Sequence, residues 1–547
     1  MKPFLVPVLM ALTFELCVDL ANAQLPPGSI MTVRAAHSHS VSMRLRDMVT
    51  CPMETRAVIP GRNDGPTGNF LSDPIVSFEG LHVGELVHGN CSRSGVASDD
   101  SGAVGFDHYV QVVNTAVAVY DKQGNMLAGP VSSTRFWENQ PDCGGFVGDY
   151  ATDAVVRFDR YANRWIISVP GWGLQGGNLG DGLCVAISQT SDPTGRYDQY
   201  AFEVNNVANG LFGFFNDYPK ISVFPDAYYA VADPNRIFTG LGNTISAFER
   251  AAMLAGNPAP RSVTFFLPAP RSPLQITHSH MLAADLDGRR LPPTHTPEYV
   301  VQVQDSNFGF PAGRLQVYEF HVDWNSPSSS TLIPTASLIP DPFNSEVCAS
   351  GNCIKQPGVT DKLDSLSYGY MMQRLVYRNF GTYQTLLFNH TVAADGDPSH
   401  DHAGIRWYEL RKPAGERTHG PWEIYQQGTY APDANDRWLG SIGMDVNGNI
   451  ALGFGVSGHN VYPSLHYAGR RLTDPLGTFP SGDISLIDGD DVQRHDVEFG
   501  DYSQMTIDPT DDCTFWYTGT YYPMINTPND WHTRIGSFRF ADCAPRD

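Results

Sequence analysis

The sequence predicts an all-β protein, a β-propeller of five to seven blades tied by disulfide bonds. Many short runs of strand length, separated by turn residues, repeat from about Asp107 to the C-terminus. Glycine (52) and proline (40) are abundant while only 17% of the residues are charged, which favours strands and tight turns over helices. Radial repetition protects the sheet edges that an open sheet of this size would expose.

The predicted strands are rich in β-branched and aromatic residues. They include HYVQVVNTAVAVYD, RWIISVPG, EYVVQVQ, GTYQTLLFNHTV and CTFWYTGTYY. Such runs, bounded by Gly, Pro, Asn and Asp, are typical of strands. One segment differs, because Ala, Leu and Met lead to a glycine in TISAFERAAMLAG, and we predict a helix over residues 244–256.

Turn motifs recur along the chain and support a modular sheet. Residues 121–125 and 445–449 both run from Asp to Gly-Asn, which suits a hairpin turn with positive φ. Asp-Pro-x-Gly occurs at 192–195 and 474–477, and a looser Asp-Pro-Thr-Asp occurs at 508–511. The repeats are too irregular to fix the number of blades.

The first 23 residues have the features of a secretory signal peptide. Lys2 precedes an apolar run, and Ala21-Asn22-Ala23 resembles a cleavage site, so we predict a secreted protein. Glu15 and Asp19 argue against a transmembrane segment. Residues 24–70 lack periodicity and are predicted to form an irregular leader before a propeller domain over residues 71–547.

The charge of the protein limits its partners. Acidic residues (58) outnumber basic ones (36), which gives a formal net charge of −22. This field repels nucleic acids and anionic lipid surfaces, so we expect neither as a partner. An extracellular glycan or small molecule is the expected ligand.

Eight cysteines follow the predicted signal peptide, an even number that suggests disulfide bonds in an exported protein. Cys348 and Cys353 can close a short loop, and Cys513 with Cys543 can tie down the C-terminal segment. The sequence contains no CxxC motif, which argues against a redox or zinc role.

Several stretches resemble a group of large secreted proteins, mostly bacterial, without an established activity. The resemblance covers residues 75–543 and is carried by SDDSGAVGFDHYVQVVN at 98–114, SDPTG at 191–195, NDYPKI at 216–221, GIRWYE at 404–409, GDYS at 500–503 and DPTDDCTFW at 508–516. It implies a β-propeller and no catalytic assignment. The Asp-Pro-x-Gly turns are also similar to sialidase Asp-box turns, although their spacing differs and the Thr-Trp is missing.

Candidate catalytic residues are Asp501, Glu409 and Arg406. In FGDYSQMTIDPTDDCTFWYTGTYY, residues 505–508 and 513–518 are predicted strands joined by a turn, and Asp501 lies just before them. Glu409 could serve as a second carboxylate, and Arg406 could bind an acidic sugar. Tyr408 and Glu409 point to opposite faces of a strand, so they cannot act as a pair.

Two metal sites are also conceivable from the sequence. Asp445, Asn447 and Asn449 place oxygen atoms around a sharp turn, as a structural calcium ion requires, without EF-hand spacing. His390 and His402, with the aspartates between them, are the best candidates for a transition-metal site.

The predicted function is binding or hydrolysis of glycans, as a lectin-like protein or a glycoside hydrolase. Aromatic side chains can stack on sugar rings while carboxylates bond the hydroxyl groups. The alternatives are a metal-dependent secreted enzyme that uses residues 390–402, and an extracellular scaffold protein without catalysis. Composition and fold do not choose among them.

Overall fold

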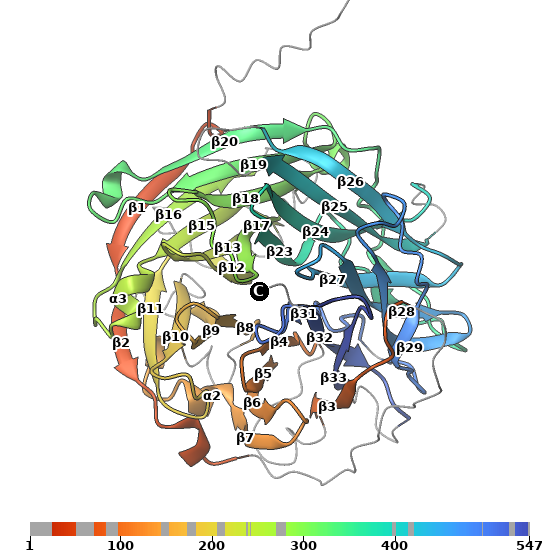
Figure 1. Cartoon of the computed structure of the whole chain (residues 1–547), viewed down its shortest axis with the longest axis horizontal. Helices are drawn as coiled ribbons and strands as arrows, with labels where there is room; N and C mark the ends of the chain where they lie inside the picture. Colours follow the sequence, from red (N-terminus) through yellow and green to blue (C-terminus); the bar gives the residue numbers. More distant parts are fainter. Residues whose placement is uncertain are drawn as a thin grey trace, which may run out of the picture.

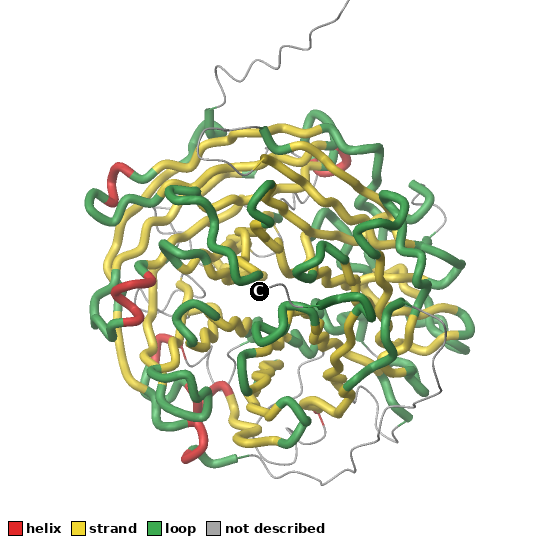
Figure 2. Tube along the Cα trace, in the orientation of Figure 1, coloured by secondary structure: helices red, strands yellow, loops and turns green. Residues whose placement is uncertain are grey.

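The protein is a set of antiparallel sheets placed around a common centre (Figure 1). The computed structural model describes residues 24–50, 70–83, 97–143, 152–171, 182–204, 214–236, 239–240, 242–269, 280–396, 401–413, 421–494, 496–524 and 531–544. Strands dominate, and short helices lie at the periphery (Figure 2). They are α2 (Ser133–Phe136), α3 (Arg250–Leu254) and the 3-10 turns η2 (Leu45–Asp47), η3 (Pro141–Cys143), η4 (Ser306–Phe308) and η5 (Pro327–Ser329).

The first three sheets come mainly from the N-terminal half. One contains β4 (Ser101–Val104), β5 (His108–Val113), β6 (Ala116–Asp121) and β7 (Met126–Ser132). The next contains β8 (Val155–Asp159), β9 (Arg164–Gly171), β10 (Gly182–Ser188), β11 (Tyr197–Glu203) and β2 (Ser38–Val41). The third contains β12 (Phe214–Val223), β13 (Tyr228–Arg236), β15 (Gly242–Phe248), β16 (Arg261–Pro268) and β1 (Ile30–Ala35), with β14 (Thr239–Gly240) paired to β13.

An eight-stranded sheet follows, built from two four-stranded antiparallel halves. They are β17 (Met281–Asp287), β18 (Glu298–Gln304), β19 (Arg314–His321) and β20 (Thr331–Leu338), then β23 (Met371–Asn379), β24 (Tyr383–Ala393), β25 (Ala403–Pro413) and β26 (Glu423–Tyr430). The halves join through the parallel pair β17–β23. A small two-stranded sheet, β21 (Asn352–Ile354) with β22 (Leu363–Asp364), lies between them in sequence.

The last two sheets close the arrangement. One contains β27 (Asp436–Met444), β28 (Ile450–Gly458), β29 (Val461–Arg470) and β30 (Ile484–Ile487). The other joins β31 (Gln504–Ile507), β32 (Thr514–Tyr521) and β33 (His532–Arg539) to β3 (Val76–His82) from the N-terminal region. This last sheet therefore unites the two ends of the chain in one hydrogen-bonded unit.

The innermost strands form a ring in which each touches the next: β4, β8, β12, β17, β23, β27 and β31, which returns to β4. Neighbouring inner strands run in the same direction. Ser101 contacts Gln504 near the start of β4 and β31, and the Val104 amide contacts Thr506 near their ends. All these strands therefore begin at one end of the centre and end at the other.

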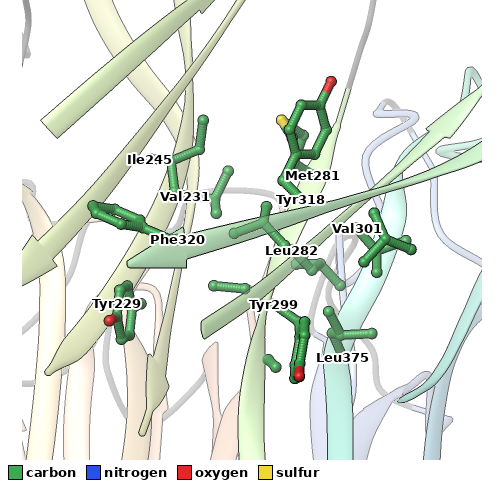
Figure 3. Packing of buried hydrophobic residues seen from close by; sticks show 14 of the residues in the cluster. Tyr229, Val231, Ile245, Met281, Leu282, Tyr299, Val301, Tyr318, Phe320 and Leu375 are labelled. Carbon is green, nitrogen blue, oxygen red and sulfur yellow. The ribbon is translucent and has the colours of Figure 1, made fainter. Parts of the chain in front are cut away.

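Hydrophobic side chains fill the space between neighbouring sheets. In one cluster, Tyr229 and Ile245 of the third sheet pack against Leu282, Val301 and Phe320 of the next half-sheet (Figure 3). Strands covered on both faces are apolar or buried throughout, as in β23, β27 and β28, whose residues are all buried. This packing fixes the inner strands and the residues at their ends.

Two sequence predictions need correction. Residues 30–41 of the predicted irregular leader contribute β1 and β2, which add outer strands to two sheets. Residues 244–256 are not one helix, because 244–248 belong to β15, which pairs with β13 and β16, and α3 is only five residues long. Pairing on both sides overrides the local helix preference there.

The predicted disulfides Cys348–Cys353 and Cys513–Cys543 are confirmed, and Cys143–Cys184 is a third. Cys51, Cys91 and the predicted signal peptide lie outside the described residues. The two strands predicted around Asp508–Asp511 are confirmed as β31 and β32. In the described part of the chain, no helix has the length and apolar character needed to cross a membrane.

Candidate active site

Three carboxyl groups from three sheets gather where the inner strands begin. Asp99, Asp153 and Asp501 lie just before β4, β8 and β31. All three have positive φ angles, 47°, 55° and 59°. Asp tolerates this left-handed conformation better than most residues, and such backbone strain is concentrated at functional sites.

Asp99 is the most enclosed of the three, with an exposed fraction of 2%. Burial raises the pKa of its carboxyl group well above the usual range, and the charges of Asp153 and Asp501 raise it further. Its hydrogen bond to Asp153 also raises this pKa, whereas one with Asn114 opposes the shift. Asp99 therefore keeps its proton at a higher pH than an ordinary aspartic acid.

Asp501 is half-buried, and its Oδ1 atom is buried without a hydrogen-bond partner among the described residues. Burial raises the pKa of this carboxyl group well above the usual range, followed by the charges of Glu498 and Asp153. Asp501 therefore keeps its proton at a higher pH than an ordinary aspartic acid and still reaches the surface.

Lys220 is the central cation of the site. Its Nζ atom lies 3.5 Å from the centre of the Tyr218 ring and 3.8 Å from that of Tyr502. Burial lowers the pKa of Lys220 to about 8, although Asp153 and Asp99 act in the opposite direction. The two ring faces and the two carboxyl groups stabilise the positive charge of the Lys220 ammonium group, which burial alone would disfavour.

The local sequence explains how Lys220 reaches the centre. β12 and β13 pair with a register shift between Asp217 and Lys220, at Pro219, which has no amide hydrogen to donate. Tyr218 has a φ of 54° and packs edge-on against Tyr502, and its hydroxyl donates to the Asp501 backbone oxygen at 3.4 Å. This bulge brings β12 and the loop before β31 together.

A buried histidine extends the site. The His280 ring stacks on Tyr370 with centroids 3.4 Å apart and forms an ion-pair contact with Asp233. Burial lowers the pKa of His280 well below the usual range, and the charge of Lys220 adds to the effect. His280 therefore loses its proton at a lower pH than an ordinary histidine, and its ring forms a wall of the site.

Buried ion pairs occupy the centre below the carboxyl groups. The Arg374 Nη1 atom lies 2.9 Å from Asp285 Oδ2 and 3.0 Å from Asp287 Oδ1, and Arg157 Nε lies 3.1 Å from Asp285 Oδ2. The cavity beside them measures about 30 Å³, which is room for about one water molecule. A ligand of the carboxyl groups must therefore approach from the end where the inner strands begin.

The arrangement combines three carboxyl groups and a cation. The raised pKa of Asp99 and Asp501 and the ammonium group of Lys220 suit general acid–base chemistry. The rings of Tyr218, Tyr370 and Tyr502 add flat apolar surface.

The other predicted catalytic residues lie elsewhere. Glu409 and Arg406 belong to β25, in the outer part of their half-sheet. Glu409 is fully buried and accepts hydrogen bonds from Arg411 and Gln426, both at 2.5 Å. Arg406 donates to Gln427 at 2.5 Å. The structure does not bring either residue to the Asp501 site.

The predicted calcium ligands form a hydrogen-bonded turn between β27 and β28. Asp445 Oδ1 accepts from the backbone amides of Asn447 and Asn449 at 2.8 and 2.9 Å, and Oδ2 accepts from the Asn449 side chain at 2.8 Å. The turn's own amides thus account for both carboxylate oxygens. Calcium binding here stays a prediction.

The histidine cluster has no ligand geometry in the described residues. His390 is fully buried and its Nε2 atom is 3.2 Å from the Tyr408 hydroxyl. Burial lowers its pKa to about 3. His402 Nε2 lies 3.3 Å from the Asn435 backbone oxygen, and residues 397–400 lie outside the described residues. In the part of the chain that the structure describes, no group of three metal-binding side chains occurs.

Sequence reasoning assigned no role to Asp99, Asp153 and Lys220. Asp99 and Lys220 lie in the stretches SDDSG and NDYPK, which carried the resemblance described above. The clue that could have found the two aspartates is an acidic residue just before an inner strand, whereas Lys220 lies within β12 at its register shift. That clue becomes visible only when the strands are aligned by their place in the ring.

Comparisons with known proteins leave the family open. No family model matches the chain, and no curated protein matches it. An endo-arabinase from Bacteroides thetaiotaomicron VPI-5482 is 12% identical, with 60% of this chain and 95% of that chain covered and a TM-score of 0.28. An exo-β-1,3-galactanase from Clostridium thermocellum is 11% identical, with coverages of 87% and 98% and a TM-score of 0.30.

A polysaccharide lyase of family PL25, an ulvan lyase bound to -[GlcA(1-4)Rha3S]-, is 11% identical to this chain. The alignment covers 81% of this chain and 95% of the lyase, with a TM-score of 0.38. All three scores are below 0.5. The function is therefore argued from the site alone.

Proposed function

We propose that the protein is a secreted glycoside hydrolase on a seven-bladed β-propeller, with its active site at the carboxyl groups of Asp99, Asp153 and Asp501. The closed ring of inner strands and the union of both chain ends in the last sheet support the propeller. The disulfide bonds support export. The resemblance to large secreted, mostly bacterial proteins supports the secreted propeller and assigns no activity.

The observation that carries the function is the gathering of three carboxyl groups at the start of the inner strands, with a raised pKa for Asp99 and Asp501. Asp501, half-exposed and with a raised pKa, is suited to protonate the oxygen of a glycosidic bond. Asp153 lies near Asp99 and Asp501, and we assign it the second carboxyl role, either as a base toward water or as a nucleophile. The site thus supplies the pair of carboxyl groups that glycoside hydrolysis needs.

The remaining groups position and stabilise these two. Lys220 places a positive charge beside Asp153 and Asp99. The ring of Tyr502 contacts this ammonium group, and the half-buried ring of Tyr370 lies nearby against Tyr218. Tyr370 can therefore offer a face to a sugar ring.

The test is hydrolysis of a panel of neutral and acidic oligosaccharides, measured as new reducing ends. The variant Asp501→Asn keeps the size of the side chain, and Asn also tolerates positive φ. We expect it to lose at least about 1,000-fold in turnover with little change in Tm, as for removal of a general acid. The matched control is Asp47→Asn, an exposed residue outside the site.

Two results would oppose this proposal. Turnover of Asp501→Asn equal to that of the unmodified protein would remove Asp501 as the acid. Binding of a glycan without any hydrolysis, lost in the same variant, would instead identify a lectin-like site at the same place.

A further inference from the structure

A groove of about 530 Å³ lies at the other end of the centre, where the inner strands end. It is formed by the loops after β17 and β23 and by the turns that follow β27 and β31. The lining residues are Gly288, Arg289, Arg290, Arg378, Asn379, Phe380, Val446 and Asp512. This groove is separate from the carboxyl site, because the buried ion pairs of Arg374 lie between the two ends.

The groove is positively charged in a strongly acidic protein. Three arginines face one acid, while the whole chain has a net charge of −22. Arg289 and Arg290 are exposed. Arg289 Nη2 donates to the Thr510 backbone oxygen at 2.8 Å, and Arg290 lies against Gly381 and forms no ion pair with a described acid. Both guanidinium groups can therefore donate hydrogen bonds to an added anion.

The floor of the groove contains the buried Arg378, whose charge acts on Asp512 and also on Asp287 and Asp445. Arg378 is 3% exposed, its Nη2 atom lies 3.5 Å from Asp512 Oδ1, and its Nε atom has no partner among the described residues. Asp512 Oδ1 also accepts from Arg160 Nη1 at 2.9 Å. One carboxylate is thus shared by two guanidinium groups.

Glycine makes room for this buried arginine. Gly288 has a φ of 87°, and a Cβ atom there would come within 3.0 Å of Arg378 Nη1. The Tyr161 hydroxyl donates to the Gly288 backbone oxygen at 2.6 Å and holds the loop. The position of Arg378 is therefore built into the packing.

We propose that this groove binds the carboxylate or sulfate group of an acidic saccharide. The planar guanidinium group forms paired hydrogen bonds with such oxyanions, and Arg289, Arg290 and Arg378 offer several. Phe380, half-buried in the same groove, supplies an apolar face for the sugar. The inference that the groove binds an oxyanion rests on the arginines alone. The inference that this oxyanion belongs to a saccharide rests on the proposed glycan function.

The rest of the molecule makes this groove selective. An acidic protein repels anions in general, so an anion is attracted only to a part of the surface where the local electrostatic potential is positive. The attraction between exposed arginines and an anion weakens as salt is added. We therefore expect binding that is tighter at low ionic strength.

The experiment is isothermal titration of the full chain with four probes: inorganic sulfate, a sulfated disaccharide, a disaccharide with an unsulfated uronate, and a neutral disaccharide. The test variant replaces Arg289 and Arg290 by Gln, which leaves the buried Arg378 in place. The control is Arg44→Gln, an exposed arginine outside the groove. We expect the double variant to bind the acidic disaccharides about tenfold or more weakly, as for loss of charged hydrogen bonds.

The outcomes separate this proposal from the proposed hydrolase. Equal affinity of the double variant and the control for every acidic probe would overturn the groove, and so would tighter binding of the neutral disaccharide. If the protein binds inorganic sulfate but neither acidic disaccharide, the proposal that the ligand is a saccharide is overturned. Inorganic sulfate is no substrate of a glycoside hydrolase, so weaker sulfate binding by the double variant would stand even if hydrolysis failed. The sulfated and uronate arms identify which oxyanion is preferred.

Discussion

The two ends of the centre differ in both charge and burial. Where the inner strands begin, Asp99, Asp153 and Asp501 crowd around one lysine, and burial raises the pKa of Asp99 and Asp501. Where they end, Asp512 lies between two guanidinium groups, and despite its burial their charges lower its pKa. The same ring of strands thus creates proton donors at one end and a fixed carboxylate at the other. Loops at strand ends can change the chemistry without altering the sheets.

The largest expected effect is on the stability of the arginine end. Asp512→Asn removes the charge that pairs with Arg160 and Arg378, and breaking such a buried pair costs about 3 kcal/mol. Because the folded pKa of Asp512 is lowered, its contribution is present above the ordinary pKa of aspartic acid and is lost as the pH falls through the folded pKa. Urea unfolding should therefore show a large deficit at pH 7.

The same measurement below pH 3 supplies the control for Asp512→Asn. The unmodified aspartic acid is then increasingly protonated and resembles asparagine, so the deficit should shrink. An unchanged deficit at both pH values would show that hydrogen bonding, and not the ion pair, holds this end together.

The second effect concerns the charge of Lys220 at the carboxyl end. The lysine loses its proton at a pKa of about 8, so turnover of a glycan should fall as the pH rises through that value. Lys220→Met should lower turnover about 100-fold, the size typical of a lost charge at a reacting group. It should also remove the part of the decline that falls near pH 8, whereas the loss of the Asp501 proton still lowers turnover at high pH.

The pH profile distinguishes a chemical role of Lys220 from a structural one. Lys220→Arg keeps a positive charge whose pKa lies far higher. Its turnover should therefore no longer fall near pH 8, even if its absolute value is low. A decline near pH 8 in both variants would assign that pKa to another group.

The sequence predicted the strands better than the site. The alternating pattern and the turn at Asp508–Asp511 are local features, and β31 and β32 lie where they were expected. The Cys348–Cys353 pair is close in sequence and was also found. In contrast, residues 244–248 look helical by local preference, because only pairing with β13 and β16 makes them a strand.

The candidate site could not be assembled from sequence, because its parts are far apart along the chain. Asp99, Asp153, Lys220 and Asp501 come from four different sheets, and only closure of the ring brings them together. Asp501 could be singled out because it remained once the neighbouring strands and turn were explained. Glu409 was chosen for its residue type, but its neighbours Arg411 and Gln426 give it a role in packing.

The smallest effect concerns the stability of the carboxyl end, and its sign is opposite to that at Asp512. The folded pKa of Asp99 is raised, so the stability present below about pH 4 is lost as the pH rises through the folded pKa. Asp99→Asn does not lose this stability, since asparagine never ionises. We expect its Tm to rise relative to the unmodified protein as the pH increases from 4 to 8. A difference in Tm that stays constant over this range would mean that folding does not raise the pKa of Asp99, and the contrast between the two ends would then rest on Asp501 alone.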